Sequence, residues 1–316
     1  MSAAAGGSTR NVHMLDVSRR PSFDAGRESP GWVRISYASA LALRLVSGRF
    51  SRSLTFGGVN ILLTYADGCL SDCGYCGLAR TRPVAPDAER SFIRVQWPLV
   101  ATDDLVSRLE RHESTLSRLC ISMVTHARAF EDTLALSARI TRSVDTPLSV
   151  LVAPAALDEQ RLLALRKAGV QTIGIGLDAV TEELFGALRT DVPHGGLRWE
   201  RYQRTIEAAR RVFGPWQVNC HTLVGLGESD RELIACFTNL LEHQVHAYLL
   251  HTVHGLDGAL KLGFKGALVV DLLREIAARP VGLVEELKAH ASAGQGALRG
   301  RLQARLVEFV GGHQNC

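Results

Sequence analysis

The sequence predicts an α/β protein built as a partial (β/α)6 barrel of the TIM type. Six short apolar, β-branched segments alternate along the chain with longer segments of helical period. The apolar segments are nearly continuous, which is typical of parallel strands with helices outside them. A doubly wound sheet fits the same pattern, and both architectures place functional residues at the carboxyl ends of the strands. With 316 residues and 46% hydrophobic content, the chain is long enough to bury such a core.

The individual elements follow from this alternation. Strands are expected over 59–65, 118–125, 148–154, 171–178, 217–227 and 246–253. The helices between them are expected over 102–114, 129–141, 157–169, 198–213 and 228–244. Thr102 and Ser229 are candidate N-caps, and Glu232 would complete a capping box with Ser229. Gly169 suits the position that follows the end of a helix.

Composition divides the chain into three regions. Residues 1–30 are small and polar and are broken by Gly, Ser and Pro, which predicts a disordered N-terminal segment. Residues 31–255 hold the barrel, and a helix over 32–49 is expected to lead into it. Residues 256–316 carry helical patterns separated by loops and are expected to form a helical C-terminal cap.

Charge and hydropathy favour a soluble cytoplasmic protein. The net charge is +4, and Lys and Arg are spread among Asp and Glu without a dense basic stripe, so no nucleic-acid partner is expected. The N-terminus has no signal-peptide pattern, and no apolar run reaches the roughly 18 residues of a membrane span. In the reducing cytoplasm, clustered cysteines are metal ligands or catalytic groups more often than disulfides.

Three of the seven cysteines, Cys69, Cys73 and Cys76, lie together in the stretch DGCLSDCGYCGLAR, directly after the first predicted strand. Three thiolates at this spacing can hold three corners of an iron–sulfur cubane and leave one iron without a protein ligand. A structural zinc site normally has four protein ligands, often as two CxxC pairs, and only one such group is present.

This CX3CX2C motif, with the aromatic Tyr75 before its last cysteine, resembles the signature of the radical S-adenosylmethionine (SAM) superfamily. The resemblance implies a [4Fe–4S] cluster held by Cys69, Cys73 and Cys76, with SAM bound at the open iron. It further implies that an electron from a reductant such as ferredoxin or flavodoxin cleaves SAM to a 5′-deoxyadenosyl radical, which abstracts hydrogen from the substrate.

The segment HTLVGLGESD, residues 221–230, resembles the G-x-I-x-G-x-x-E element of the same superfamily. Gly225 and Glu228 match that element and are expected to contact SAM, whereas His221 stands where the first glycine is usual. A simple strand-to-helix turn at Gly227 explains the same stretch without a ligand.

Further SAM contacts are implied at the ends of two other strands. GLDAVTEELF resembles the ribose-binding segment of biotin synthase, with Asp178 matching and Gly176 in place of the asparagine. Asp178 is equally suited to cap the following helix. After the second strand, where the superfamily contacts the SAM amino group, the candidates are Ser122, Thr125 and His126.

Among radical SAM enzymes, the passages ILLTYADGCLSDCGYCGLAR and CISMVTHARAFEDT look most like the subunits of two-component lipoyl synthases. That resemblance implies sulfur insertion into an octanoylated lipoyl carrier protein, a paralogous partner subunit and a source of sulfur. Two alternatives remain open. One is another biotin-synthase-like enzyme, namely a mutase, a methylase or a cofactor maturase, and the other is a non-catalytic metal-binding module.

A sacrificial second cluster would need further ligands, for which the candidates are Cys120, Cys220 and Cys316. In biotin synthase the fifth-strand ligand would align with Asn219, one residue from Cys220, and a shift of one residue turns a strand side chain to the opposite face. The mid-helix Cys236 is expected to be core packing.

Three histidines and one loop are the remaining candidates for functional roles. His251 and His254 end the sixth strand, where they would orient the substrate, relay a proton or serve the structure. His313 lies in the C-terminal tail, which either folds over the barrel mouth or is disordered. The basic, aromatic loop 189–204 either faces a carrier protein or is a mobile surface loop.

Overall fold

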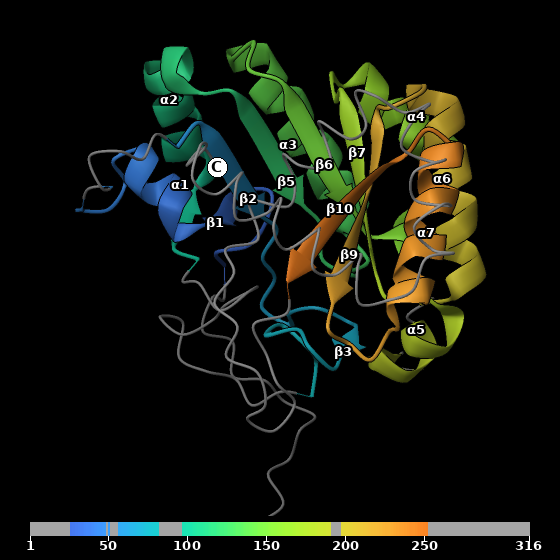
Figure 1. Cartoon of the computed structure of the whole chain (residues 1–316). Coiled ribbons are helices and arrows are strands. Elements are labelled where there is room, and N and C mark those ends of the chain that lie inside the picture. The colour runs from blue at the N-terminus through green and yellow to red at the C-terminus, as the bar shows by residue number, and fades with distance from the viewer. Residues whose placement is uncertain (1–25, 49, 51–55, 82–96, 191–196, 252–316) are drawn as a thin grey trace, which may run out of the picture.

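The computed structural model describes residues 26–48, 50, 56–81, 97–190 and 197–251, which form an eight-stranded sheet with helices along one face (Figure 1). The strand order is β10-β9-β7-β6-β5-β2-β1-β4, and a separate two-stranded sheet joins β3 to β8. The strands are β1 (Trp32–Ile35), β2 (Gly58–Leu62), β3 (Asp72–Cys73), β4 (Leu99–Ala101), β5 (Arg118–Ser122), β6 (Leu148–Val152), β7 (Thr172–Asp178), β8 (Arg189–Thr190), β9 (Val218–Val224) and β10 (His246–His251).

The six predicted parallel strands are confirmed as β2, β5, β6, β7, β9 and β10, each hydrogen-bonded in parallel to the next. Their carboxyl ends therefore meet at one edge of the sheet, where the loops that follow them gather. Within the described residues the sheet does not close, since β10 forms one edge and β4 the other. The architecture is that of a partial barrel.

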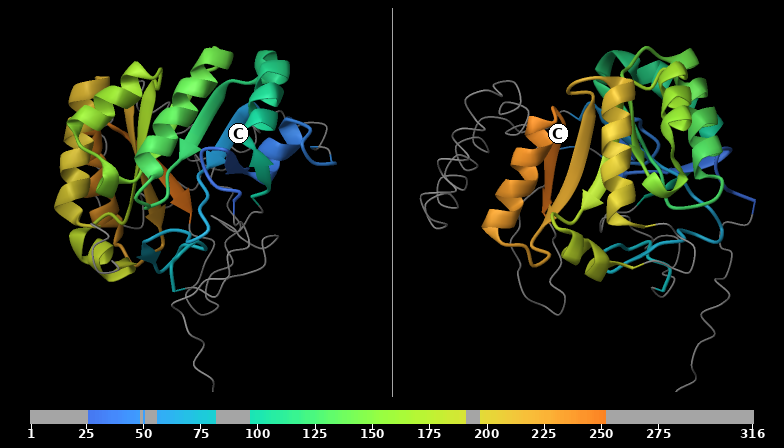
Figure 2. Two further views of the ribbon diagram at one scale, coloured as in Figure 1. Left: turned by 180° about the vertical axis from the view of Figure 1, so that it is seen from behind. Right: turned by 90° about the vertical axis from the view of Figure 1, so that its right-hand side faces the viewer.

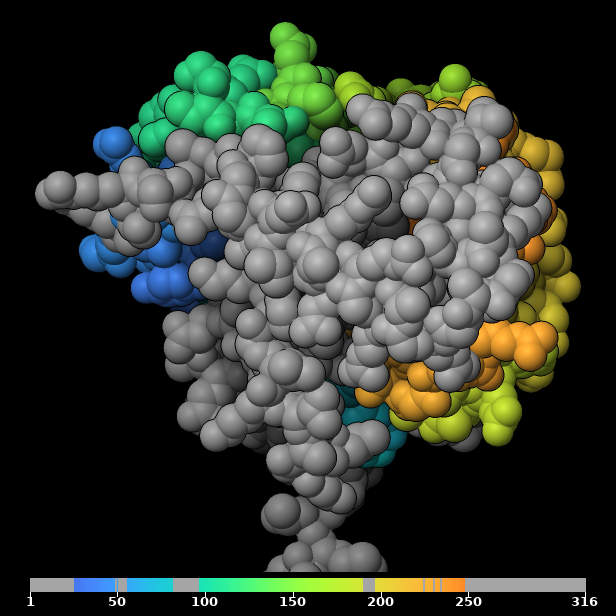
Figure 3. All heavy atoms as spheres, in the orientation of Figure 1, coloured from blue at the N-terminus to red at the C-terminus, as the bar shows by residue number. Residues whose placement is uncertain are grey.

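Helices cover one face of this sheet (Figure 2), and in the view of Figure 3 the atoms of α6 and α7 flank its right-hand side. The helices are α1 (Tyr37–Ala42), α2 (Thr102–His112), α3 (Ala129–Ser143), α4 (Glu159–Lys167), α5 (Glu182–Leu188), α6 (Trp199–Phe213) and α7 (Asp230–Glu242), with short 3-10 turns at Glu113–Thr115 and Pro154–Ala156. Strand residues on the helix side, such as Leu119, Ile121, Val150, Ile173 and Ile175, are fully buried and apolar. We call the opposite side of the sheet its inner face.

The helix predicted over 32–49 is wrong in its first part. Residues Trp32–Ile35 form β1, which pairs antiparallel with both β2 and β4, and only Tyr37–Ala42 is helical. The short segment contains β-branched Val33 and Ile35, which favour a strand once two partner strands are available. Ser36 then starts α1, because its side chain accepts a hydrogen bond from the Ser39 N–H.

The predicted helix ends agree with the structure at two of three positions. Ser229 and Glu232 form the expected capping box at the start of α7. Gly169 follows the end of α4 with a φ of +91°, the left-handed conformation that favours glycine. Thr102 is the first helical residue of α2 and not its N-cap, which is Ala101, and its Oγ1 donates to the Pro30 carbonyl 2.6 Å away.

The regions predicted from composition are described only in part. Residues 1–25 and 252–316 lie outside the described residues, and with them the predicted C-terminal cap. The described end of the N-terminal region is packed against the sheet, and Ser29 is 2% exposed. No helix in the described ranges is long and apolar enough to cross a bilayer.

Candidate active site

The three clustered cysteines lie on the loop that follows β2, at the carboxyl edge of the sheet. Cys73 is buried within β3, which pairs antiparallel with β8 through the Cys73–Arg189 and Asp72–Thr190 registers. Cys69 and Cys76 are half-buried. Two backbone N–H groups donate to the sulfurs at 3.4 Å, from Ser71 to Cys69 and from Leu78 to Cys76. Such donors stabilise a thiolate, the form of cysteine that binds metal.

Burial acts against ionisation of these thiols. It raises the pKa of Cys73, and it raises the pKa of Cys76 to about 12, with the neighbouring Cys73 and Cys69 adding to the effect on Cys76. Cys73 and Cys76 therefore need a cationic partner to ionise near neutral pH. No three His, Cys, Asp or Glu side chains of the described ranges surround a point as ligands of one metal ion would. A cubane binds each thiolate at a different iron, so this donor set fits a cluster.

Tyr75 connects the cysteine loop to the end of β7. Its hydroxyl donates to Asp178 Oδ2 at 2.5 Å, and burial followed by the nearby Asp178 charge raises the Tyr75 pKa. Asp178 has a φ of +63°, and the β7–β9 pairing shifts register beside it. Aspartate tolerates this left-handed conformation better than most residues, so the strand can end by turning the carboxylate towards the cysteine loop.

The structure excludes one of the two roles considered for Asp178. The N-cap of α5 is Thr181, whose side chain accepts from the Leu184 N–H at 3.2 Å. The prediction that Asp178 caps this helix is therefore wrong. The carboxylate is instead available to the site, where it also meets the Arg189 guanidinium at 3.0 Å.

Arg189 pairs with Cys73 in the β3–β8 sheet, a position beside the cysteines that the sequence did not predict. It directly follows α5, and its guanidinium lies 4.8 Å from the centre of the Tyr202 ring and 5.2 Å from that of Phe185. It also donates to the Gly176 carbonyl. Its side chain is 10% exposed, so at least this start of the loop 189–204 is buried and does not form a surface for a carrier protein. Residues 191–196 lie outside the described residues.

The turn after β9 is held closed by Glu228. One carboxylate oxygen accepts from the Gly225 N–H at 2.6 Å and the other from the Leu226 N–H at 2.9 Å. Gly225 and Gly227 have φ values of +95° and +122°, which explains why glycine is used at both positions. The matched residues of this element therefore fix the shape of a loop at the carboxyl edge.

The loop after β5 touches the cysteine loop at two points. The Thr125 carbonyl accepts from the Leu70 N–H at 2.8 Å, and His126 Nε2 lies 3.2 Å from Asp67 Oδ1. Ser122, the last residue of β5, is 5% exposed. Thr125 and His126 thus lie beside the cysteine loop, and Ser122 contacts the chain just after β2 through its carbonyl, which accepts from the Leu63 N–H.

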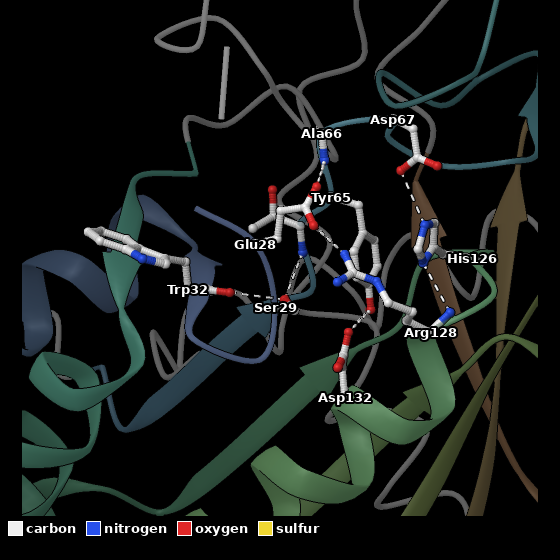
Figure 4. A network of polar contacts seen from close by, with 10 residues as sticks. Glu28, Ser29, Trp32, Tyr65, Ala66, Asp67, His126, Arg128 and Asp132 are labelled. Carbon is white, nitrogen blue, oxygen red and sulfur yellow. Dashed lines mark hydrogen bonds and ion pairs between the residues drawn. The ribbon is translucent and has the colours of Figure 1, made fainter. Parts of the chain in front are cut away.

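A polar network ties the N-terminal segment to the same region (Figure 4). Glu28 accepts from the Ala66 N–H at 2.7 Å and from Arg128, whose guanidinium lies 4.9 Å from the centre of the Tyr65 ring. The Tyr65 hydroxyl donates to Asp132 at 2.9 Å. Figure 4 shows the Glu28 carboxylate between the strand that leads to the cysteines and the start of α3. This segment therefore supports the base of the cysteine loop.

We expect Glu28→Gln to lower the free energy of unfolding by about 1–3 kcal/mol at pH 7, because two hydrogen bonds to a charged acceptor weaken. Burial alone would raise the Glu28 pKa, but the Ala66 N–H and Arg128 together hold it below its ordinary value of 4.5. A carboxyl group with a lowered pKa stabilises the fold above pH 4.5, and this contribution is lost as the pH falls through the folded-state pKa.

Urea unfolding of the wild type and Glu28→Gln at pH 7, 5 and 3.5 tests this expectation. The difference between the two proteins should shrink towards the lowest pH. The exposed Glu110→Gln is the matched control and should change stability little at any pH. A difference that stays constant down to pH 3.5 would contradict the assigned role of the Glu28 charge.

Of the candidate ligands of a second cluster, the two in the described residues, Cys120 and Cys220, are not brought together. Cys120 lies on the inner face, in register with Asn60 and Ser149. Cys220 is fully buried on the helix side, where its thiol is close enough to Cys236 of α7 for their charges to interact. The predicted one-residue offset from Asn219 thus places the Cys220 thiol on the wrong face for a shared cluster with Cys120.

The remaining candidates are described less fully. Cys236 is half-buried and packs against the core, as predicted. His251 ends β10, but its side chain is outside the described residues. His254, His313 and Cys316 also lie outside them.

Comparison with known proteins agrees with the geometry. A sequence profile described as the radical SAM superfamily matches residues 63–238, more than half of the chain, including the cysteine loop and the turn after β9. Among solved structures, the fold is similar to methylornithine synthase, with a TM-score of 0.51 and 12% identity over 75% of this chain and 66% of that one. It is also similar to HydG, a maturase of the [FeFe]-hydrogenase, with a TM-score of 0.50 and 14% identity over 77% of this chain and 53% of that one.

These two likenesses show the fold alone, because the identities are low. The chain spans less than two thirds of the length of either protein. A search of curated proteins found no match to this sequence.

Proposed function

Because the chain belongs to the radical SAM superfamily, we propose that Cys69, Cys73 and Cys76 hold its [4Fe–4S] cluster and that the chain is a radical SAM enzyme. In this superfamily the cluster and SAM together supply a 5′-deoxyadenosyl radical, which abstracts hydrogen from the substrate. The observation that carries the proposal is the cysteine loop itself. Its three cysteines lie on one loop at the carboxyl edge of a parallel sheet, and backbone N–H groups point at two of the sulfurs.

The residues around the loop support binding of SAM beside the cysteines. Asp178 Oδ2 already receives the Tyr75 hydroxyl and the Arg189 guanidinium. A carboxylate has about four lone-pair positions, so Asp178 retains acceptor capacity for ribose hydroxyls. Arg189 orients this carboxylate through their ion pair, and Tyr75 keeps it next to the cysteine loop.

The other proposed SAM contacts line the same edge. Ser122 and Thr125 lie where β5 ends against the cysteine loop, and the Gly225–Glu228 turn lies where β9 ends. Because Glu228 occupies two of the backbone N–H groups of that turn, we assign it the role of fixing the turn and expect SAM to contact the backbone around it.

The test is cleavage of SAM by the full chain after anaerobic reconstitution with iron and sulfide. With dithionite as the reductant, we expect 5′-deoxyadenosine and methionine to form, and neither should form without a reductant. A protein that retains about four irons per chain but yields no 5′-deoxyadenosine would favour a non-catalytic metal-binding module.

Two reactions remain candidates for the specific chemistry that this radical SAM enzyme performs. The sequence resemblance to two-component lipoyl synthases supports sulfur insertion into octanoyl chains of a lipoyl carrier protein, together with a paralogous partner subunit and a ferredoxin or flavodoxin reductant. The alternative is a biotin-synthase-like mutase, methylase or cofactor maturase that acts on a small molecule. The opposite orientations of Cys120 and Cys220 give no support to a sulfur-donating cluster built on both.

Iron analysis separates these candidates. A chain with a second cubane should hold about eight irons, and Cys120→Ala should lower that number to about four. A chain with one cluster should hold about four irons in both proteins. The second result would remove a sulfur source within this chain and favour the small-molecule reaction.

A further inference from the structure

The inner face of the sheet is more polar than its helix side, and one row of neighbouring strands shows the contrast. On the inner face, this row runs across β2, β5, β6 and β7 and consists of Asn60, Cys120, Ser149 and Thr172, each in register with the next. On the helix side, Leu119, Leu148 and Ile173 are essentially fully buried and apolar. A row of polar side chains on one sheet face offers hydrogen-bonding groups to a ligand, so this row is a candidate binding surface.

Arg118 places a positive charge on this face. It begins β5, and its Nε donates to Ser149 Oγ at 3.2 Å while its Nη2 donates to Thr172 Oγ1 at 3.0 Å. The guanidinium thus extends from β5 across β6 towards β7. The two hydroxyls orient it but do not neutralise it. Across the described parts of the chain, no carboxylate forms an ion pair with Arg118.

Asn219 adds an acceptor that lacks a donor. It lies on β9 in register with Gly174 and is 4% exposed. In the described structure its Oδ1 is buried without a hydrogen-bond partner. A Cβ at Gly174 would come within 2.8 Å of this oxygen and 3.5 Å of His221 Nε2, so the glycine makes room for both side chains. A buried amide oxygen left without a donor destabilises the structure, and a ligand donor would remove that cost.

His221 connects this region to the SAM side of the site. Burial lowers its pKa to about 4, the Asp178 charge opposes that shift, and the Arg118 charge adds to it. The imidazole is therefore neutral near pH 7, so one ring nitrogen can donate and the other can accept. His221 lies on β9 in register with Gly176 of β7, close enough to both Arg118 and Asp178 for their charges to act on its pKa.

We propose that Arg118, Asn219 and His221 form the substrate site of this enzyme, with Arg118 pairing with a carboxylate of a small molecule and Asn219 accepting a hydrogen bond from it. This inference rests on the proposed function, whose substrate class it names. One guanidinium balances one carboxylate, whereas a phosphate ester carries close to two charges and would leave one uncompensated. An octanoyl amide has no carboxylate, so the inference favours the small-molecule reaction over sulfur insertion.

The experiment measures thermal unfolding of the reconstituted full chain in the presence of SAM. The probes are acetate, propionate, succinate and alanine, with acetamide and propionamide as uncharged counterparts and inorganic phosphate as the other anion. We expect at least one carboxylate to raise the unfolding temperature, whereas its amide and phosphate do not. In Arg118→Gln the affinity for that carboxylate should fall about tenfold or more.

Arg204→Gln is the matched control, because Arg204 is exposed on α6 and away from the sheet face. It should respond to the probes as the wild type does. Equal responses to carboxylate and amide, a larger response to phosphate, or an unchanged response in Arg118→Gln would each overturn the inference. If Arg118→Gln does not fold, the wild type alone still tests the inference, because a carboxylate should raise its unfolding temperature and the matching amide should not.

Failure of this inference is distinguishable from failure of the proposed function. The unfolding measurement does not require turnover, and 5′-deoxyadenosine formation without any carboxylate reports on SAM cleavage alone. If the chain cleaves SAM but no carboxylate raises its unfolding temperature, the proposed function stands and the proposed substrate class is wrong.

Discussion

Replacing Cys73 by alanine should abolish formation of 5′-deoxyadenosine and reduce the iron content from about four per chain to near zero. Cys73 is the middle of the three proposed ligands, and its backbone is held by the β3–β8 pairing. Because of this pairing, the loop cannot shift to bring another side chain to the iron that Cys73 would bind. Anaerobic reconstitution, iron and sulfide analysis and product chromatography measure the two effects. Cys69→Ala and Cys76→Ala should behave in the same way.

The matched control is Cys236→Ala, which removes a half-buried thiol from α7. It should keep full iron content and SAM cleavage. A Cys73→Ala protein that still forms 5′-deoxyadenosine at more than a few per cent of the wild-type rate would show that the cluster has other ligands.

Arg189→Ala should lower the free energy of unfolding of the cluster-free chain by about 3–5 kcal/mol, because it leaves the Asp178 carboxylate buried without its cation. It also removes the stacking of the guanidinium on Tyr202 and Phe185. We expect the variant to load cluster poorly, since Arg189 is also the residue paired with Cys73. Urea unfolding gives the first effect, and iron content after reconstitution gives the second.

A surface ion pair provides the comparison. Arg211 and Glu159 lie 2.9 Å apart with side chains that are 60% and 51% exposed, so Arg211→Ala should cost no more than about 1 kcal/mol. The double variant Arg189→Gln/Asp178→Asn should recover part of the loss, because it no longer buries an unpaired charge. Equal destabilisation by Arg189→Ala and Arg211→Ala would exclude a buried charge pair as the cause.

Features with local causes could be predicted from the sequence. The six parallel strands follow from continuous apolar runs, and the start of α7 follows from the Ser229–Glu232 capping box, which needs only four residues. The cysteine loop was recognisable because three thiols lie close together in the chain. In each case the residues that decide the structure are near neighbours in sequence.

Features with distant causes could not be predicted. Trp32–Ile35 became a strand because β2 and β4 lie on either side of it, a fact absent from its own four residues. Arg189 lies at the site because α5 ends beside Asp178. Arginine is common after helices, so its presence there does not indicate a functional role. Arg118 and Asn219 were missed because only strand register shows that both face inwards.

The contact between Tyr75 and Asp178 joins positions separated by 103 residues, and the pairing of Cys73 with Arg189 spans a similar distance. The ribosome must therefore release β7, α5 and β8 before the cysteine loop can adopt its final form. We infer that the loop emerges early during synthesis but is completed late, so that assembly factors meet an open, thiol-bearing nascent chain. Cluster delivery to this protein can then be completed only after its middle third has left the ribosome.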